Sequence, residues 1–107
     1  MKQITPVQLA EWLQDASRPA PFLLDVREPS EFAYCAIPGS VPMPMASVPA
    51  RAQELPDDVD IVVICHHGAR SMQVAAFLAA RGFAHVANVA GGINAWSAEL
   101  DPSIPLY

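Results

Sequence analysis

Residues 60–71 of the chain read D-I-V-V-I-C-H-H-G-A-R-S and carry the strongest indication of the fold class. Four consecutive β-branched residues predict a strand over residues 60–65 that is covered on both faces, as in a parallel sheet. The strand ends at Cys65, and we expect a short turn over residues 66–69. Arg70 to Arg81 then predicts a helix, because its apolar and small residues recur at helical spacing.

The rest of the chain alternates in the same way. Thr5, Pro6 and Gln8 predict a helix start, with a cap, a proline at the first helical position and a capping-box partner. The further elements expected are a strand over 22–26, a short helix opening at 28–32, a mostly irregular stretch over 37–49 with a short strand near Val41, a small helix around 48–55, a strand over 85–89 and a helix over 93–100. This order predicts an α/β fold: an open, mainly parallel sheet of about five strands with helices on both faces.

Composition narrows the class of protein. The length of 107 residues is typical of one domain, which we expect to span residues 1–107. Hydrophobic residues make up 52% of the chain and charged residues 16%, which predicts a packed core. A net charge of −5 argues against a broad basic surface for nucleic acid. No apolar run approaches the ~18 residues of a membrane span, so we expect a cytoplasmic protein with Cys35 and Cys65 as free thiols.

Cys65 stands where an open α/β sheet places its sites, beyond the carboxyl end of a strand. Backbone N–H groups of the following turn and the helix start can form an anion-binding cup there. A cysteine at its base should hold more of its thiol as the nucleophilic thiolate. Gly68 lets the turn curl, and Arg70 adds a cation. The alternative is a buried core thiol, but the strand end, glycine and arginine together favour a reactive cysteine.

Four motifs in the same order resemble those of single-domain rhodaneses. Residues 65–71 match the active-site pattern C-x-x-G-x-R-S, and residues 24–32 match L-D-V-R-E-x-x-E-F. Residues 37–40 resemble I-P-G-A, and residues 91–96 match G-G-x-x-x-W. Each motif alone is weak, but their order and spacing over most of the chain are specific. The resemblance therefore implies a rhodanese-like domain.

The resemblance also implies a mechanism. The thiolate of Cys65, the catalytic residue, attacks a small anionic sulfur donor such as thiosulfate and becomes a persulfide, and cyanide or an acceptor thiol then removes the sulfur. No metal or organic cofactor is implied, and the adjacent His66 and His67 lack the spaced ligands of a zinc site. The implied substrate-binding loop consists of His66, His67, Gly68, Ala69, Arg70 and Ser71, with Asp25 and Arg27 as supporting residues of a mainly structural kind.

Two side chains have alternative roles. Arg70 can bind the donor or stabilise the thiolate, or it can pair with Asp25 or Glu31 to hold the loop. Cys35 stands in a Cys-Ala pair where the family usually has Gly-His. Its ordinary role is that of a small apolar filler, and the sharper hypothesis is a second thiol that accepts sulfur from Cys65 or forms a disulfide with it.

Three other functions compete with the sulfurtransferase. A phosphatase or arsenate reductase of the same fold is less favoured, because such phosphatases use C-x5-R and this loop is C-x4-R, from Cys65 to Arg70. A non-catalytic binding module is a second alternative, although such domains have often lost the cysteine. A sulfur carrier that serves one protein acceptor is the third.

Overall fold

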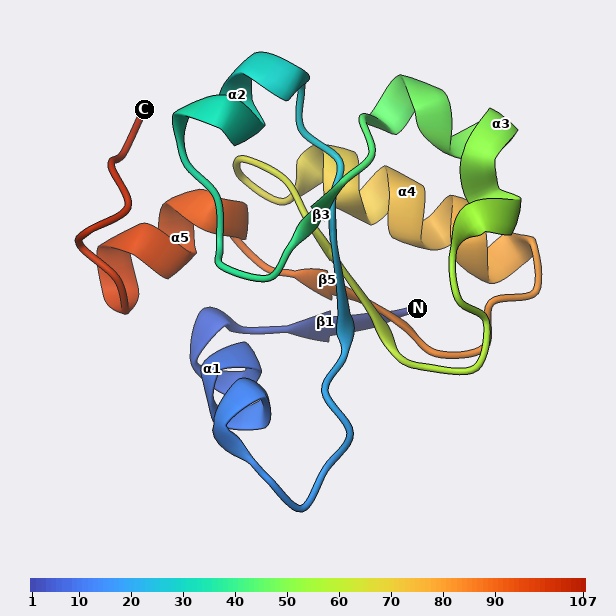
Figure 1. Ribbon diagram of the computed structural model, residues 1–107, viewed down its shortest axis with the longest axis horizontal. Helices are drawn as coiled ribbons and strands as arrows, with labels where there is room; N and C mark the ends of the chain where they lie inside the picture. The colour runs from blue at the N-terminus through green and yellow to red at the C-terminus, as the bar shows by residue number, and fades with distance from the viewer.

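Five parallel strands form a single sheet in the computed structural model, which describes residues 1–107. The strands are β1 (Lys2–Ile4), β2 (Phe22–Asp25), β3 (Val41–Pro42), β4 (Ile61–Ile64) and β5 (Val86–Val89). Their order is β1-β5-β4-β2-β3, with β1 beside β5 at one edge (Figure 1). The strand β4, which Cys65 follows directly, lies in the middle of this order. The predicted open parallel sheet is confirmed.

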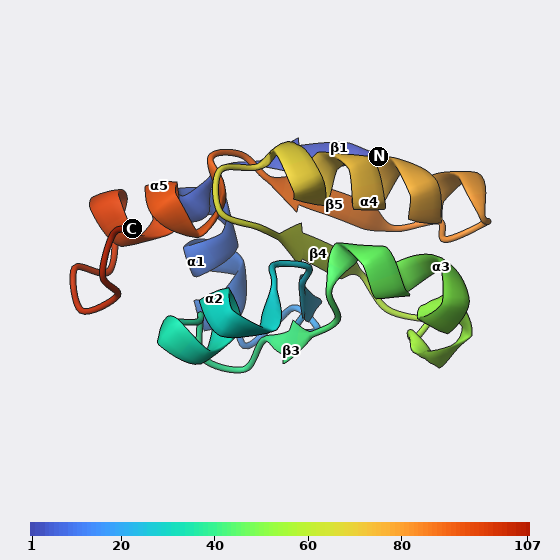
Figure 2. The same ribbon diagram turned by 90° about the horizontal axis from the view of Figure 1, so that it is seen from above.

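Helices cover both faces of this sheet, as predicted. The helices are α1 (Pro6–Gln14), α2 (Pro29–Tyr34), α3 (Val48–Arg51), α4 (Ala69–Ala80) and α5 (Gly92–Glu99), and two 3-10 turns, Met45–Ser47 and Ala52–Glu54, flank α3. Figure 2 shows α3 and α4 on one side and α1 and α5 on the other. The small helix expected around 48–55 is shorter than predicted, because α3 ends at Arg51 and a 3-10 turn follows it. The bounds of α2, α4 and α5 differ from the prediction by one or two residues, as is usual where helix ends fray.

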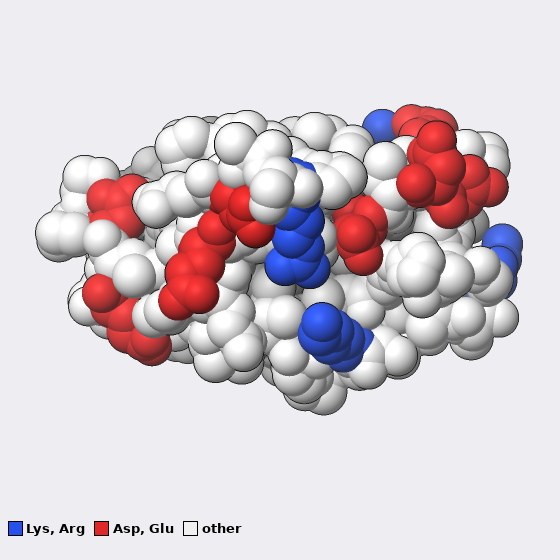
Figure 3. Space-filling view, turned by 90° about the horizontal axis from the view of Figure 1, so that it is seen from below, with Lys and Arg blue, Asp and Glu red and all other residues white.

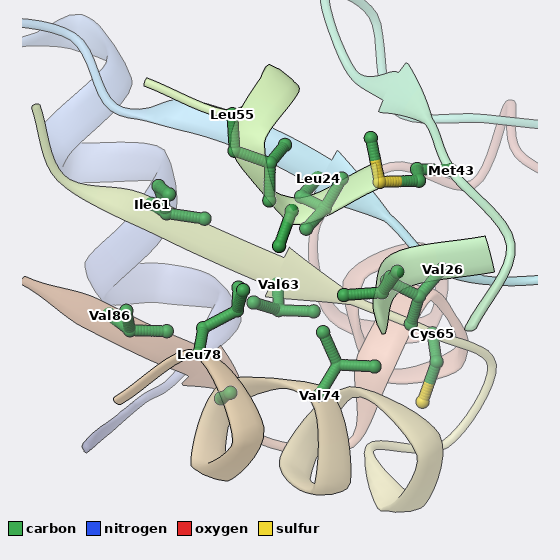
Figure 4. Close-up of a cluster of buried hydrophobic side chains, with 13 residues drawn as sticks. Leu24, Val26, Met43, Leu55, Ile61, Val63, Cys65, Val74, Leu78 and Val86 are labelled. Carbon is green, nitrogen blue, oxygen red and sulfur yellow. The ribbon is translucent and has the colours of Figure 1, made fainter. Parts of the chain in front are cut away.

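Side chains of β4 point alternately into two separate hydrophobic cores. Ile61, Val63 and Cys65 belong to the cluster beneath α3 and α4 (Figure 4). Val62 and Ile64 belong to the cluster beneath α1 and α5. Because successive residues of a strand face opposite sides, a strand buried on both faces must be apolar at every position. This requirement explains the run of β-branched residues.

The first helix begins as its sequence predicts. The Gln8 backbone N–H donates to the Thr5 hydroxyl at 3.1 Å, and the Thr5 N–H donates to the Gln8 side chain at 2.9 Å. This capping box satisfies two donors that would otherwise lack partners. Farther along α1, the Trp12 indole donates to the Pro19 carbonyl at 2.9 Å and is buried. The capping box thus fixes the start of α1 directly after β1.

Nothing in the sequence predicted β1. This strand has three residues, of which only Ile4 is buried, so it lacks the alternation or apolar run that indicates a strand. Its pairing with β5 places Gln3 directly opposite Asn88. Tertiary pairing with a strand more than eighty residues away, rather than local propensity, therefore makes this segment extended.

No helix in the structure has the length and apolar character needed to cross a bilayer. On the face shown in Figure 3, acidic side chains lie on both sides of a small basic patch. This mixture agrees with the net charge of −5.

Candidate active site

Cys65 lies directly after β4, at the carboxyl edge of the sheet, and is 1% exposed. Its Sγ points toward the first turn of α4 (Figure 4). The Gly68 N–H donates to Sγ at 3.0 Å, and the Ser71 hydroxyl lies 3.2 Å from it. An N–H group of the turn and a hydroxyl of the helix that follows it therefore lie within hydrogen-bond distance of the sulfur.

Several backbone N–H groups around this sulfur have no acceptor in the protein. Met72 is the first residue of α4 whose N–H bonds to a carbonyl, that of Gly68, at 3.2 Å. The N–H groups without a protein acceptor belong to His66, His67, Ala69, Arg70 and Ser71. Unpaired N–H groups at a helix start attract anions, and the helix dipole adds to the effect. The turn therefore provides the donors that the sequence predicted.

A second loop is clamped against this turn. The N–H groups of Ile93 and Asn94, in the first turn of α5, donate to the carbonyls of Cys65 and His66 at 2.8 and 3.0 Å. Gly92 has a φ of +59°, and a Cβ there would lie 2.5 Å from the His66 carbonyl oxygen. Glycine is required at this position by both conformation and space. The second glycine of the G-G-x-x-x-W motif thus allows α5 to hold the loop after Cys65 in place.

Arg70 pairs with Glu31 and not with Asp25. Its guanidinium donates to both carboxylate oxygens of Glu31 at 2.6 and 3.0 Å. The hydrogen bonds from Arg70 lower the pKa of Glu31 to about 2 and raise the pKa of Arg70. Of the two roles considered for Arg70, the geometry therefore agrees with the structural one. Its pairing with Glu31 links α4 to α2.

Asp25 and Arg27 form a buried ion pair at the end of β2. Arg27 is 0% exposed, and its Nη2 lies 2.7 Å from Asp25 Oδ2. The same nitrogen donates to the Cys35 carbonyl at 2.6 Å. Burial works against the charge of Arg27, but bonds to Asp25 and Tyr107 outweigh it and raise the pKa of Arg27. Neither side chain has a hydrogen bond to Cys65, and their hydrogen bonds link β2 to the residues after α2, which agrees with a structural role for the pair.

Comparison with known proteins shows which family the chain belongs to. The sequence profile described as the rhodanese-like domain matches residues 5–99. The chain belongs to the rhodanese-like domain family.

A sulfurtransferase of Allochromatium vinosum is 44% identical over 75 residues, which cover 70% of each chain. The putative sulfur carrier protein YrkF of Bacillus subtilis is 39% identical over 79 residues, 74% of this chain and 43% of that protein. A rhodanese-related protein from Thermoplasma volcanium has a crystal structure with a TM-score of 0.86, at 32% identity and with 100% of both chains covered.

One aromatic side chain of this rhodanese-like domain reaches the site without any signal in the sequence. Tyr107 stacks on His66 with ring centroids 3.8 Å apart and an interplanar angle of 1°. Its hydroxyl donates to Glu31 and accepts from Arg27, both at 2.8 Å. Burial raises the pKa of Tyr107 to about 12, while burial and the neighbouring His67 lower the pKa of His66. Both shifts favour the uncharged forms of the two stacked rings.

A buried polar side chain was also missed. Asn88, in β5, is 1% exposed and accepts a hydrogen bond from the Ser71 hydroxyl. Its amide nitrogen donates to Gln3 Oε1 at 2.8 Å. The only available signal was a polar residue inside an apolar strand. Such a residue must find partners when buried, but the sequence cannot name them.

A shallow groove of about 680 Å³ borders the loop of this rhodanese-like domain. Its walls combine the exposed His67 and Met72 with small and polar residues, namely Gln3, Gly68, Ala69, Gln73, Ala76, Asn88, Ala90 and Gly91. The groove therefore offers a largely uncharged surface beside the cysteine.

Cys35 and Cys65 are free thiols on different cores. Cys65 belongs to the cluster beneath α4, whereas the half-buried Cys35 packs against the cluster beneath α1 and α5. The Cys35 sulfur lies 3.9 Å from Arg27 Nη1 and 3.9 Å from the Pro105 carbonyl oxygen. This packing agrees with a filler role for Cys35. Its role as a second thiol that accepts sulfur from Cys65 stays a prediction.

The clamp yields a first prediction. Gly92→Ala should lower the free energy of unfolding by about 2–5 kcal/mol, because a left-handed residue with a Cβ is strained and the Cβ overlaps the active loop. Gly82→Ala is the matched control, since Gly82 has a φ of +99° but no atom within 4 Å of the position that a Cβ would take. It should lose only about 1–2 kcal/mol. Urea denaturation measures both, and equal losses would contradict the clamp.

The Glu31–Arg70 pair yields a prediction about pH. The pKa of Glu31 falls from 4.5 to about 2 on folding, so its contribution to stability is present above pH 4.5 and is lost as the pH falls toward 2. Wild type should therefore melt above Glu31→Gln at neutral pH, and the gap should close toward pH 2. Glu54→Gln breaks an exposed pair with Arg51 and should change the melting temperature little at any pH. A gap that does not change with pH would refute the assignment.

Proposed function

We propose that this rhodanese-like domain is a sulfurtransferase, which moves sulfane sulfur from a donor such as thiosulfate to a thiophilic acceptor through a persulfide on Cys65. The observation that carries the proposal is the position of the Cys65 sulfur, 3.0 Å from the Gly68 N–H and 3.2 Å from the Ser71 hydroxyl, at the start of α4. The sulfurtransferase name of the Allochromatium relative supports sulfur transfer in general.

The first step is a displacement at sulfur. The Cys65 thiolate attacks the outer sulfur of thiosulfate, and a new S–S bond forms. The S–S bond of the donor breaks, and sulfite leaves with its electron pair. The hydrogen bond from the Gly68 N–H favours the thiolate that begins the reaction, and the Ser71 hydroxyl adds a second when its proton points to the sulfur. Donors aimed at a charge stabilise it most where water is excluded.

The intermediate is a persulfide with its negative charge on the outer sulfur. The N–H groups of the loop and the first turn of α4 that have no acceptor in the protein are the donors we propose for this charge. The helix dipole of α4 acts in the same sense. Backbone donors are well suited to this task because the chain as a whole carries a charge of −5 and does not attract anions by its overall field.

The second step returns the enzyme to its first state. An acceptor thiolate or cyanide attacks the outer sulfur, and the persulfide S–S bond breaks with its electron pair on Cys65. The acceptor leaves as a persulfide or as thiocyanate, and no metal or organic cofactor takes part. Splitting one transfer into two displacements is the advantage of covalent catalysis.

Sulfur is a better match to this loop than phosphate. Four residues separate Cys65 from Arg70, one fewer than in the phosphatase pattern. Both terminal nitrogens of the Arg70 guanidinium donate to Glu31. Arg70 therefore has no free pair of donors for a bidentate contact with a phosphoryl group. We assign Arg70 the role of holding the loop and supplying a positive potential beside it.

A sulfur carrier with a protein acceptor is the second candidate. The uncharged groove beside the loop and the exposed Met72 suit contact with another chain. The Bacillus relative named a putative sulfur carrier protein points the same way. Both candidates use the persulfide on Cys65 and differ in what removes the sulfur.

For either one we propose the cytoplasm as the location, since both cysteines are free thiols.

Intact-protein mass spectrometry after incubation with thiosulfate tests the proposal. Wild type should gain the mass of one sulfur atom, and addition of cyanide should remove it, because the persulfide is the transferable form. Cys35→Ala should behave like wild type, whereas Cys65→Ala should gain nothing. A folded, reduced wild type that gains no sulfur from thiosulfate or from a low-molecular-weight persulfide would refute sulfur transfer by this cysteine.

A chase with excess dithiothreitol separates the two candidates. Rapid release of the sulfur indicates an enzyme that serves small thiols. A persulfide that survives the thiol but is removed by cyanide indicates a carrier that waits for a protein acceptor.

A further inference from the structure

We propose that Gln3, Asn88 and Ser71 form a hydrogen-bond relay that sets the direction of the Ser71 hydroxyl, toward the Cys65 sulfur or away from it. Asn88 and Gln3 are then positioning residues for Cys65. The inference rests on the proposed function only in taking Cys65 as the residue that carries the sulfur.

The relay is a continuous series of contacts from the edge of the sheet to the sulfur. Gln3 lies opposite Asn88 in the β1–β5 pairing, and the Asn88 amide nitrogen donates to Gln3 Oε1 at 2.8 Å. Asn88 Oδ1 accepts from the Ser71 hydroxyl, and Ser71 Oγ lies 3.2 Å from Cys65 Sγ. Ser71 and Asn88 are 0% and 1% exposed, so water cannot replace a missing partner without cost.

The Ser71 hydroxyl has two neighbours and one proton. A hydroxyl donates one hydrogen bond, so its contacts with Asn88 Oδ1 and with Cys65 Sγ cannot both be donated at once. When the proton points to Asn88, the thiol of Cys65 can donate to the oxygen of Ser71. This arrangement satisfies the protonated cysteine and gives no hydrogen bond from Ser71 to a thiolate.

The opposite arrangement suits the thiolate or the persulfide. If the Asn88 amide turns over, its nitrogen donates to Ser71 Oγ and the hydroxyl proton points to the sulfur. The two ends of an amide have nearly the same shape, so both orientations fit the same space. Asn88 Oδ1 then faces Gln3, whose amide must turn to donate. Gln3 is exposed, and its nitrogen contacts only the Met1 sulfur, at 3.8 Å, so little opposes this turn.

Residue 3 therefore controls the polarity of the buried contacts. A side chain that only accepts keeps the Asn88 nitrogen toward residue 3 and the Ser71 proton toward Asn88. A side chain that only donates turns Asn88 over and sends the Ser71 proton to Cys65. The substitutions Gln3→Glu and Gln3→Lys supply these two cases at an exposed position.

The readout is the ratio of thiolate to thiol at Cys65, measured by ultraviolet thiolate absorbance at one neutral pH in a Cys35→Ala background. A hydrogen bond gained or lost at the sulfur should change this ratio about fivefold. We expect Gln3→Glu to lower the ratio and Gln3→Lys to raise it. Thermal melting of each variant confirms that it is folded.

Two controls separate the relay from a direct effect of charge. In a Ser71→Ala background the relay is cut, so both changes at residue 3 should lose their effect on the ratio. Lys2→Gln makes the same change in net charge as Gln3→Glu, one residue away in β1, and should leave the ratio unchanged. Shifts that persist in the Ser71→Ala background, or the absence of any shift at residue 3, would overturn the relay.

The thiolate measurement needs no sulfur donor, so the relay and the proposed function can fail separately. Opposite shifts that vanish in the Ser71→Ala background support the relay even if thiosulfate leaves no sulfur on the protein. Persulfide formation with no shift at residue 3 would overturn the relay and leave sulfur transfer intact.

Discussion

The loop after Cys65, residues 66–69, depends on a backbone clamp between two turns. The carbonyls of Cys65 and His66 accept the N–H groups of Ile93 and Asn94, and the absence of a side chain on Gly92 allows the two turns to meet. The clamp gives hydrogen-bond partners to these two carbonyls, whereas the N–H groups of His66 and His67 have no acceptor in the protein. It also joins the ends of two adjacent strands, β4 and β5, each of which leads into a helix that covers a different face of the sheet.

The buried guanidinium of Arg27 also holds separate segments together near the loop that follows Cys65. Arg27 bonds to Asp25 at the end of β2, to the Cys35 carbonyl after α2 and to the Tyr107 hydroxyl. Tyr107 in turn bonds to Glu31, the partner of Arg70. A charge buried this completely persists only when all its donors are satisfied. The series of contacts from Asp25 to Arg70 therefore relates the end of β2 to the helix that begins at the active loop.

Much of the fold followed from local patterns. The β-branched run of β4, the capped start of α1 and the glycine turn before α5 each carry a signal within a few residues. These signals predicted the central sheet, the covering helices and the position of Cys65 at a strand end. They failed for β1, whose three residues carry no such pattern, and they left the partner of Arg70 open between Asp25 and Glu31.

Local patterns in the sequence were enough to predict that a cysteine follows a strand buried on both faces and precedes a helix. Those features depend on the periods of strand and helix, which repeat within two to four residues. The surroundings of the sulfur, in contrast, depend on tertiary contacts. Asn88 lies 17 residues from Ser71 and 85 from Gln3, and Tyr107 lies 76 residues from Glu31. Contacts over such separations are set by how the strands pair and how the loops pack, and a single sequence carries no local pattern that specifies them.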